Sequence, residues 1–356
     1  YPLRRQRQMC IRDRFYAVMF VSTIFAAATG IVGASVTILG IMAGKTMIRT
    51  GYDTRLSAGL ICAGGTLGIL IPPSIMLVVM GPVLEIPVTD LFAAAIMPGI
   101  LLACLYAAYT TLRCYLNPKL GPVLPANEQP TNMAKVWYEF IMGLIPPAGL
   151  VFFALGSILF GLATPTEGAG MGAFGAILLA LAYKKLTLPG LKDALLKTLE
   201  ITALIMFLVA ASNFFGAVFS KLGTPSLLTD FLLNLEVNRY VILAIIMAAI
   251  FLLGWPLEWV PIVLIVLPIV LPLVIELGFN LTWFAILVAV NLQTAWLSPP
   301  VALSAYFLKG VVPEWDLKDI YLGMMQFMVI QVIGLVLIII FPKIALWLPG
   351  VMYPSP

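Results

Sequence analysis

The sequence predicts an all-α polytopic membrane protein in which a re-entrant hairpin, a broken transmembrane helix and a plain helix occur twice, in inverted orientation. Hydrophobic residues make up 62% of the 356 residues and charged residues 10%, with a mean hydropathy of +1.07, whereas a soluble domain is about 25% charged. Two membrane-length apolar segments are each interrupted by small or polar residues that lead into a Pro-Pro pair. The lysines and arginines are also spread unevenly over the predicted loops.

The first membrane element is a predicted hairpin. Residues 1–14 carry five arginines and no apolar run long enough for a signal peptide, so we expect a non-native or disordered basic stretch there. The apolar segment 15–48 is interrupted by the small residues of Ala28–Ser35. Since one bilayer crossing takes about 20 residues, this pattern predicts two half-length helices joined at a tip, entering and leaving on one side.

The segment 56–82 is the first predicted broken helix, because Gly64, Gly65 and Gly68 in its middle are followed by Pro72-Pro73. Proline removes a backbone donor and clashes with the preceding turn, and glycine costs about 1 kcal/mol in a helix interior. A helix broken inside the bilayer is tolerated where its freed backbone groups face protein or a watery cavity. A plain helix over 91–112 completes the first repeat, 15–112.

The middle of the chain separates the two repeats. Its polar, proline-rich segment 113–136 predicts a loop, and residues 137–238 predict intervening scaffold-type helices. Among these, Thr166 is the expected N-cap of one helix, and Glu167 suits the N-terminus of the same helix.

The same order of elements returns in the second repeat, 239–342. It comprises a hairpin at 240–277 interrupted by Gly254–Trp259, a broken helix at 282–311 with Pro299-Pro300, and a plain helix at 319–342; residues 343–356 are the expected C-terminal tail. Gly30 at the first tip precedes Pro72 by 42 residues, and Gly254 at the second tip precedes Pro299 by 45 residues. This matched spacing is the strongest internal indication of a repeat.

The charge distribution predicts the topology. Beyond residue 14, twelve lysines and arginines fall on the side of the first hairpin's base and three on the other side. Cytoplasmic loops carry the excess of positive charge, so the base of the first hairpin is predicted to face the cytoplasm. Five intervening helices then place the second hairpin on the opposite side. Secondary transporters have such inverted repeats, with their sites at discontinuous helices near the midplane.

The two breaks are candidate ion sites, because unwound helices expose carbonyl oxygens suited to a small cation and half-helix N-termini can face an anion. Simple proline kinks and close packing of small residues are the alternative for either break alone. The candidates for the first site are Thr29, Gly30, Gly33, Ser35, Gly64, Gly65, Thr66, Gly68 and Pro72. The candidates for the second site are Gly254, Pro256, Glu258, Asn291, Gln293, Thr294, Ser298 and Pro299. Candidates for substrate binding are Ser74, Trp296 and Ser304, and none of them indicates a particular acid.

Glu258 is the one carboxylate near a predicted site. Inserting an acidic side chain at the membrane centre costs about 2.5–3.5 kcal/mol on insertion scales, so we expect Glu258 to have a specific role. It could bind a cation, carry a proton, or cap the second half-helix of the hairpin. The chain has no histidine and no catalytic constellation, so we expect no enzyme activity and no cofactor beyond coupling ions. A purely structural membrane subunit is disfavoured by two costly helix breaks.

Four motifs together resemble the large membrane subunit of the tripartite ATP-independent periplasmic (TRAP) transporters, the DctM type. They are Gly64-Gly65-Thr66 through Ile71-Pro72-Pro73-Ser74, Ala163-Thr164-Pro165-Thr166-Glu167, Asn291-Leu292-Gln293 through Ser298-Pro299-Pro300-Val301, and the tip variant Gly254–Trp259. The resemblance covers residues 15 to about 345. The family's scaffold helices that precede the first hairpin have no counterpart here, so we expect a chain lacking those N-terminal helices.

The resemblance implies sodium-driven symport of an organic acid, usually a carboxylate such as a dicarboxylate, by an elevator mechanism in the bacterial inner membrane. It implies two partners, a periplasmic substrate-binding protein and a small four-helix membrane subunit. The composition itself indicates no nucleic-acid binding. Two alternatives remain: a stand-alone divalent-anion:sodium symporter, and proton-coupled transport through Glu258.

Overall fold

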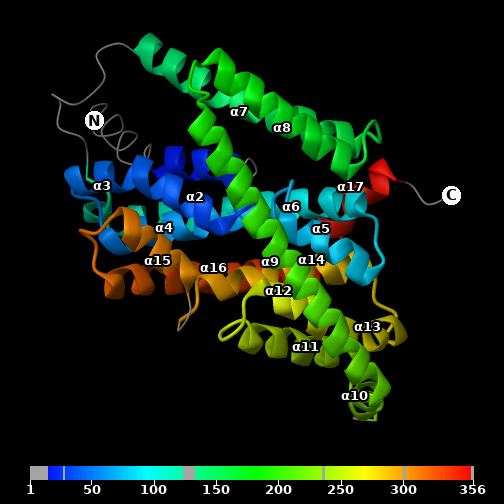
Figure 1. Ribbon diagram of the computed structural model, residues 1–356. Helices are drawn as coiled ribbons and strands as arrows, with labels where there is room; N and C mark the ends of the chain where they lie inside the picture. Colours follow the sequence, from blue (N-terminus) through cyan, green and yellow to red (C-terminus); the bar gives the residue numbers. More distant parts are fainter. Residues whose placement is uncertain (1–14, 27–28, 123–132, 235–236, 300–301, 354–356) are drawn as a thin grey trace.

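The computed structural model describes residues 15–26, 29–122, 133–234, 237–299 and 302–353, which form helices and no strand (Figure 1). Five of the described helices are long and apolar enough to cross a membrane: Val88–Leu116, Pro165–Ala182, Leu188–Lys221, Trp259–Glu276 and Leu317–Ile340. The all-α polytopic membrane class is thereby confirmed. The basic stretch 1–14 lies outside the described residues.

The segment of the first predicted hairpin contains two helical arms. One arm is the helix Phe15–Ala26, and the other is α2 (Val32–Leu39), which continues through a π-helical stretch (Gly40–Gly44) into α3 (Lys45–Arg49). Val18 and Val21 of the first arm face Met42 and Thr46 of the second across a shallow apolar cavity. The arms therefore lie side by side, and Gly30 between them adopts a left-handed conformation with φ +62°.

Both predicted broken helices are broken, and their elements correspond closely in position along the chain. The first consists of α4 (Thr54–Thr66), a 3-10 turn (Leu67–Ile69) and α5 (Ile75–Leu84); the second consists of α14 (Leu281–Gln293), a 3-10 turn (Thr294–Trp296) and α15 (Leu303–Val311). A shift of 227 positions superimposes α4 on α14, one 3-10 turn on the other, and Pro72 on Pro299. The N-caps match as well, since Asp53 and Asn280 each accept a hydrogen bond from the backbone three residues on.

The second hairpin segment follows the same scheme. Its arms are α11 (Arg239–Leu253) and a composite helix formed by α12 (Trp259–Pro261), a π-helical stretch (Ile262–Val266) and α13 (Leu267–Glu276). The plain helices that complete the two repeats are α6 (Val88–Leu116) and α16 (Leu317–Ile340).

Several bounds differ from the prediction. The helix α6 continues to Leu116 and α7 (Met133–Leu159) begins at Met133, so both helices extend into the predicted loop 113–136. The remaining intervening helices are α8 (Pro165–Ala182), α9 (Leu188–Lys221) and α10 (Thr224–Leu233), of which α9 is continuous and α10 was not anticipated. A short helix, α17 (Lys343–Met352), replaces most of the expected tail, because its apolar side packs on α6.

The predicted N-cap at Thr166 is wrong. The N-cap of α8 is Thr164, whose hydroxyl accepts from the Glu167 backbone N–H, while the Glu167 carboxylate accepts from the Thr164 backbone N–H at 2.8 Å. Pro165 explains the shift, since proline is favoured at the first helical position, which makes Thr164, two residues before Thr166, the N-cap. The expectation that Glu167 caps this helix is confirmed.

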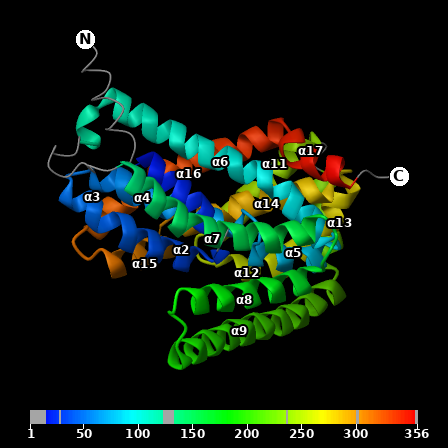
Figure 2. The same ribbon diagram turned by 90° about the horizontal axis from the view of Figure 1, so that it is seen from above.

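The two repeats interleave in the core (Figures 1 and 2). Helix α4 of the first repeat packs on α16 of the second, and α14 of the second packs on α6 of the first. Two further contacts join the repeats, α2 with α15 and α13 with α5, while α2 also contacts α4 and α11 contacts α14 within their own repeats. The helices α8 and α9 lie at the edge of this core (Figure 2).

The contact between α4 and α16 depends on glycine. A Cβ on Gly323 would lie 2.0 Å from the carbonyl oxygen of Arg55, and one on Gly59 would lie 2.6 Å from the carbonyl oxygen of Gly323. Glycine at both positions lets the two backbones approach closely, as in other membrane helix pairs. At one end of this contact, Arg55 Nε donates to Asp319 Oδ1 at 2.8 Å.

Candidate functional site

The tip of the first hairpin lies against the first break. A Cβ on Gly30 would lie 2.8 Å from the carbonyl oxygen of Pro73, and one on Gly68 would lie 3.2 Å from Ser35 Oγ. With its positive φ and this backbone contact, Gly30 occupies a position that only glycine fills without strain. The structure therefore brings together Gly30, Ser35, Gly68 and the Pro72-Pro73 pair.

The unwound part of the first break begins later than the sequence suggested. Gly64, Gly65 and Thr66 belong to α4, and the chain leaves helical geometry only after the 3-10 turn. The two glycines serve close packing instead: a Cβ on Gly64 would lie 2.6 Å from Ser22 Oγ, and one on Gly65 would lie 2.4 Å from a methyl carbon of Val36.

The hydroxyls predicted at the first site already have partners. Thr29 and Ser35 are hydrogen-bonded to each other, and Ser35 Oγ also donates to the Ile31 carbonyl at 3.0 Å. Thr66 Oγ1 donates to the Ala63 carbonyl at 2.8 Å and lies beside the Tyr106 hydroxyl of α6. The Thr66 side chain therefore lies toward α6, whereas Thr29 and Ser35 lie at the hairpin tip.

The second break contacts its own hairpin through Asn291. Asn291 Nδ2 donates to the Met247 carbonyl of α11 at 2.7 Å, whereas the buried Asn291 Oδ1 has no hydrogen-bond partner among the described residues. Near the tip, a Cβ on Gly254 would lie 3.1 Å from the Ala295 side chain. The hairpin and the break are thus joined at both Asn291 and Gly254.

Gln293 is directed away from the second hairpin, toward α16. Gln331 Nε2 donates to Gln293 Oε1 and to the Val290 carbonyl, the latter at 3.3 Å. The remaining amide atoms, Gln293 Nε2 and Gln331 Oε1, are buried and have no partner among the described residues. A polar contact thus links the end of α14 to the plain helix of the same repeat.

The remaining polar candidates of the second break are bonded to its backbone. Thr294 Oγ1 donates to the Asn291 carbonyl at 2.6 Å, and Ser298 Oγ donates to the Thr294 carbonyl at 2.8 Å. Pro299 is exposed, and residues 300–301 lie outside the described residues. The chain departs from helical geometry after Trp296, three residues beyond Gln293.

A cavity of about 190 Å³ lies where the two hairpin tips meet the two breaks. Its walls come from the first tip (Gly30–Val32), the second tip (Glu258–Val260), the breaks (Ile69 and Trp296), the start of α5 (Ile75 and Met76), and α9 (Ile201, Leu204, Ile205 and Leu208). Both halves of the chain therefore contribute to one chamber, and α9, which crosses in front of the core, closes one side of it (Figure 1).

Glu258 is the only ionisable side chain among the described residues lining this central cavity. It occupies the N-cap position of α12 but its side chain makes no capping hydrogen bond, so of the three roles considered for it the capping bond is not formed. The neighbouring Pro256 is exposed and does not line the cavity.

Three further candidates lie apart from one another. Ser74 is the N-cap of α5 and lines a different cavity of about 380 Å³ between α5 and the α7–α8 pair. Ser304 is buried on α15, where its carbonyl accepts a weak hydrogen bond from the Cys62 thiol at 3.7 Å. Gly33 contacts the Phe307 ring of α15, which stacks on Trp296 with the ring centroids 6.5 Å apart.

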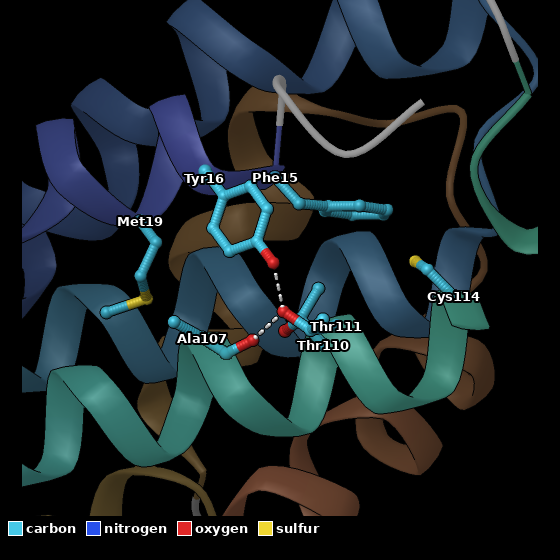
Figure 3. Close-up of a pocket in the computed structure, with 7 residues that line it drawn as sticks. All are labelled: Phe15, Tyr16, Met19, Ala107, Thr110, Thr111 and Cys114. Carbon is cyan, nitrogen blue, oxygen red and sulfur yellow. Dashed lines mark hydrogen bonds between the residues drawn. The ribbon is translucent and has the colours of Figure 1, made fainter. Parts of the chain in front are cut away.

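A fourth, much smaller cavity lies between the helix Phe15–Ala26 and α6. In Figure 3 the Tyr16 hydroxyl points to Thr111, to which it is hydrogen-bonded, and Thr111 Oγ1 in turn donates to the Ala107 carbonyl at 2.7 Å. The cavity holds about 10 Å³, which is at the lower limit for one water molecule. It is too small for an organic solute, whereas the central cavity is large enough for one and is lined by both hairpin tips and both breaks.

Sequence reasoning missed two groups of residues at the site. Gln331 stands out as a glutamine in the interior of an apolar span, and such polar residues in membranes are commonly functional, so it could have been found. The α9 side chains Ile201, Leu204, Ile205 and Leu208 carry no such signal, because they look like any lipid-facing stretch.

Comparison with known proteins places these features in a family. The profile described as "Tripartite ATP-independent periplasmic transporter, DctM component" matches residues 15–344. The chain is 29% identical to the C4-dicarboxylate TRAP transporter large permease protein DctM of Pseudomonas aeruginosa, over 94% of this chain and 77% of that protein. It is 28% identical to the sialic acid TRAP transporter large permease protein SiaM of Vibrio cholerae (93% and 76% covered) and 27% identical to the 2,3-diketo-L-gulonate TRAP transporter large permease protein YiaN of Escherichia coli (92% and 76% covered).

Proposed function

This chain belongs to the DctM family of tripartite ATP-independent periplasmic transporters, and we propose that it is the permease of a sodium-coupled importer of an organic acid. It is a TRAP large permease subunit, and thus part of a secondary transporter. The relatives are permeases for C4-dicarboxylate, sialic acid and 2,3-diketo-L-gulonate by name. An organic acid is their common chemistry.

The observation that carries the proposal is the central cavity between the two hairpin tips. Both tips and both breaks contribute to its wall, so relative movement of the hairpins would open or close it. Broken helices at a midplane site are the usual binding architecture of secondary transporters. The proposal includes the inverted orientation of the repeats, with the first hairpin's base in the cytoplasm, and an elevator movement of hairpins and breaks against α7–α9.

Sodium is the proposed coupling ion at both breaks. Asn291 Oδ1 supports this at the second break, because a buried carbonyl-type oxygen with a free lone pair is a suitable ligand for a hard cation. At the first break the ligands would be backbone carbonyls near Gly68 and Pro72, since the nearby hydroxyls are bonded to one another. Sodium entry across a 100 mV potential releases about 2.3 kcal/mol per charge, so two ions would supply about twice that amount.

The proposed assembly contains two partners in the bacterial inner membrane and the periplasm. A small membrane subunit would pack beside this chain, and a periplasmic binding protein would deliver the substrate, as the tripartite organisation of the family implies. A stand-alone divalent-anion:sodium symporter is the competing arrangement, and the requirement for added binding protein distinguishes the two.

The test is uptake into proteoliposomes containing the full-length permease and its small subunit. With binding protein outside, we expect uptake of the acid that this protein carries, lost when external sodium is replaced by choline. Asn291→Leu should raise the sodium concentration for half-maximal uptake about tenfold, and Asn291→Asp, which retains an oxygen ligand, should not. Uptake that is unchanged when choline replaces external sodium would overturn the proposal.

A proton-coupled mechanism through Glu258 is the second candidate, because this carboxylate faces the central cavity without a capping bond. If Glu258 carries the proton, Glu258→Gln abolishes uptake driven by a pH gradient. Uptake by Glu258→Gln that keeps its full sodium stimulation would exclude this role.

A further inference from the structure

The 3-10 turn of the second break leaves the Val290 carbonyl without its helical donor. In an α-helix each N–H donates to the carbonyl four residues earlier, which would pair Thr294 with Val290. The Thr294 N–H donates instead to the carbonyls of Asn291 and Leu292. Val290 is fully buried, and a buried carbonyl without a donor is destabilising. The tightened turn therefore needs another donor at this carbonyl.

Gln331 of α16 supplies that donor. Its Nε2 atom carries two N–H groups and donates to the Val290 carbonyl at 3.3 Å and to Gln293 Oε1. Both glutamines are fully buried. The bond to Gln293 orients the Gln331 amide, so that its second N–H is held at the Val290 carbonyl.

The first break lacks the same helical donor and has a different replacement. The Leu67 N–H donates to the Gly65 carbonyl, so the Ala63 carbonyl also loses its helical donor. Ala63 is the counterpart of Val290 under the shift of 227 positions. Here Thr66 Oγ1, from the same helix, donates to the Ala63 carbonyl at 2.8 Å.

The position of Thr66 is occupied by Gln293 in the second break. Gln293 does not donate to the carbonyl of its own helix, and Gln331 does so from α16. A side-chain donor at this one carbonyl is therefore common to both breaks, although it comes from a different helix in each. Its occurrence at equivalent positions indicates that both breaks require the tightened turn.

The carbonyl that Gln331 contacts adjoins the proposed sodium ligand. Asn291 follows Val290 directly, its carbonyl accepts from both the N–H and the Oγ1 of Thr294, and its side-chain Oδ1 is buried without a partner among the described residues. Without Gln331, the Thr294 N–H can return to Val290, which extends α14 and withdraws a donor from Asn291. The backbone of the break would then shift relative to Asn291 Oδ1.

We infer that Gln331 is a positioning residue for sodium binding at the second break. It acts through the Val290 carbonyl, by holding the turn in the geometry in which Asn291 Oδ1 and the unwound backbone can bind one ion together. The inference rests on the proposed function, because it concerns the proposed sodium site of the same break.

Sodium-dependent uptake tests this inference. Proteoliposomes with the full-length permease, its small subunit and added binding protein give the external sodium concentration for half-maximal uptake and the maximal rate. Gln331→Met keeps the length of the side chain and removes the donor. We expect the half-maximal sodium concentration to rise about fivefold, with the maximal rate retained at saturating sodium.

Gln326→Met is the matched control on the same helix. Gln326 also accepts hydrogen bonds in the folded protein, from the Tyr109 hydroxyl at 2.7 Å and from Arg113 Nη1 at 3.0 Å, both on α6. This variant loses a comparable polar contact away from the break. Its half-maximal sodium concentration should be that of the unchanged protein.

A pair of double variants separates positioning from stability. Gln293→Thr with Gln331→Met gives the second break the residue that occupies the equivalent position in the first, whose hydroxyl can donate to the Val290 carbonyl from within α14. We expect this variant to recover the half-maximal sodium concentration of the unchanged protein. Gln293→Val with Gln331→Met has the same shape without the hydroxyl and should not recover it.

Three results would overturn the inference: an unchanged half-maximal sodium concentration in Gln331→Met, an equal rise in Gln326→Met, or equal values in the two double variants. If Gln331→Met does not fold, the comparison of the two double variants decides. Uptake by the unchanged protein that does not depend on sodium would instead overturn the proposed function, so the two failures are distinguishable.

Discussion

Gly30 and Pro73 meet backbone to backbone: a Cβ on Gly30 would lie 2.8 Å from the Pro73 carbonyl oxygen, and Gly30 has φ +62°. One residue therefore determines how the first hairpin tip sits on the first break. Gly51 has a similar φ of +68° but only a ring carbon of Pro122 nearby, at 3.8 Å. Comparing substitutions at Gly30 and Gly51 therefore separates the effect of left-handed backbone strain from the effect of the contact with Pro73.

Gly30→Ala should abolish sodium-stimulated uptake, because the methyl group pushes the tip off the break. Gly51→Ala should retain uptake. Both variants should lose about 1–2 kcal/mol of stability from the left-handed backbone, measured by thermal unfolding in detergent. Equal uptake in both variants would show that the Gly30–Pro73 contact is dispensable.

Gln331→Leu should destabilise the protein by about 1 kcal/mol, because it leaves Gln293 Oε1 and the Val290 carbonyl without their donor. Replacing both partners, as Gln293→Leu with Gln331→Leu, should recover most of this loss, since paired apolar substitution removes the unsatisfied groups. Chemical unfolding of the single and double variants measures the coupling. Purely additive effects would mean that the two amides do not interact.

Gly323→Ala should cost about 1–3 kcal/mol by overpacking, because its Cβ would lie 2.0 Å from the Arg55 carbonyl oxygen. Gly310→Ala on α15 is the control, since nothing lies within 4 Å of its Cβ position. Thermal unfolding should separate the two variants clearly. A Gly323→Ala protein as stable as Gly310→Ala would contradict the close approach of α4 and α16.

Thr164→Ala should weaken the start of α8 by about 1 kcal/mol, the usual effect of losing an N-cap. Thr166→Ala should have little effect, because Thr166 is not the cap. Hydrogen exchange at the first turn of α8 is the measurement, and faster exchange is expected only for Thr164→Ala. The reverse result would restore Thr166 as the cap.

The breaks could be predicted from sequence because proline pairs and glycines have strong local effects. The position of the unwound residues could not, because Gly64 and Gly65 are tolerated inside α4 by close contact with Ser22 and Val36. That contact belongs to tertiary packing rather than to local propensity.

The central cavity illustrates a second limit. Its wall combines Gly30, Ile205, Glu258 and Trp296, which lie far apart in the chain. The sequence indicated Glu258 and Trp296 by their chemistry, but only the folded arrangement indicates that α9 supplies the apolar wall opposite them.

The pairing of α4 with α16 has a consequence for biosynthesis. Arg55 and Asp319, at one end of this contact, are 264 residues apart, and translation proceeds at about 5–20 residues per second. The side of α4 that carries Gly59 therefore enters the membrane tens of seconds before α16 is made. A nascent chain that ends before Leu317 lacks α16, so this side of α4 has no partner helix yet. The first repeat must persist in the bilayer as an incomplete half until the ribosome finishes the second.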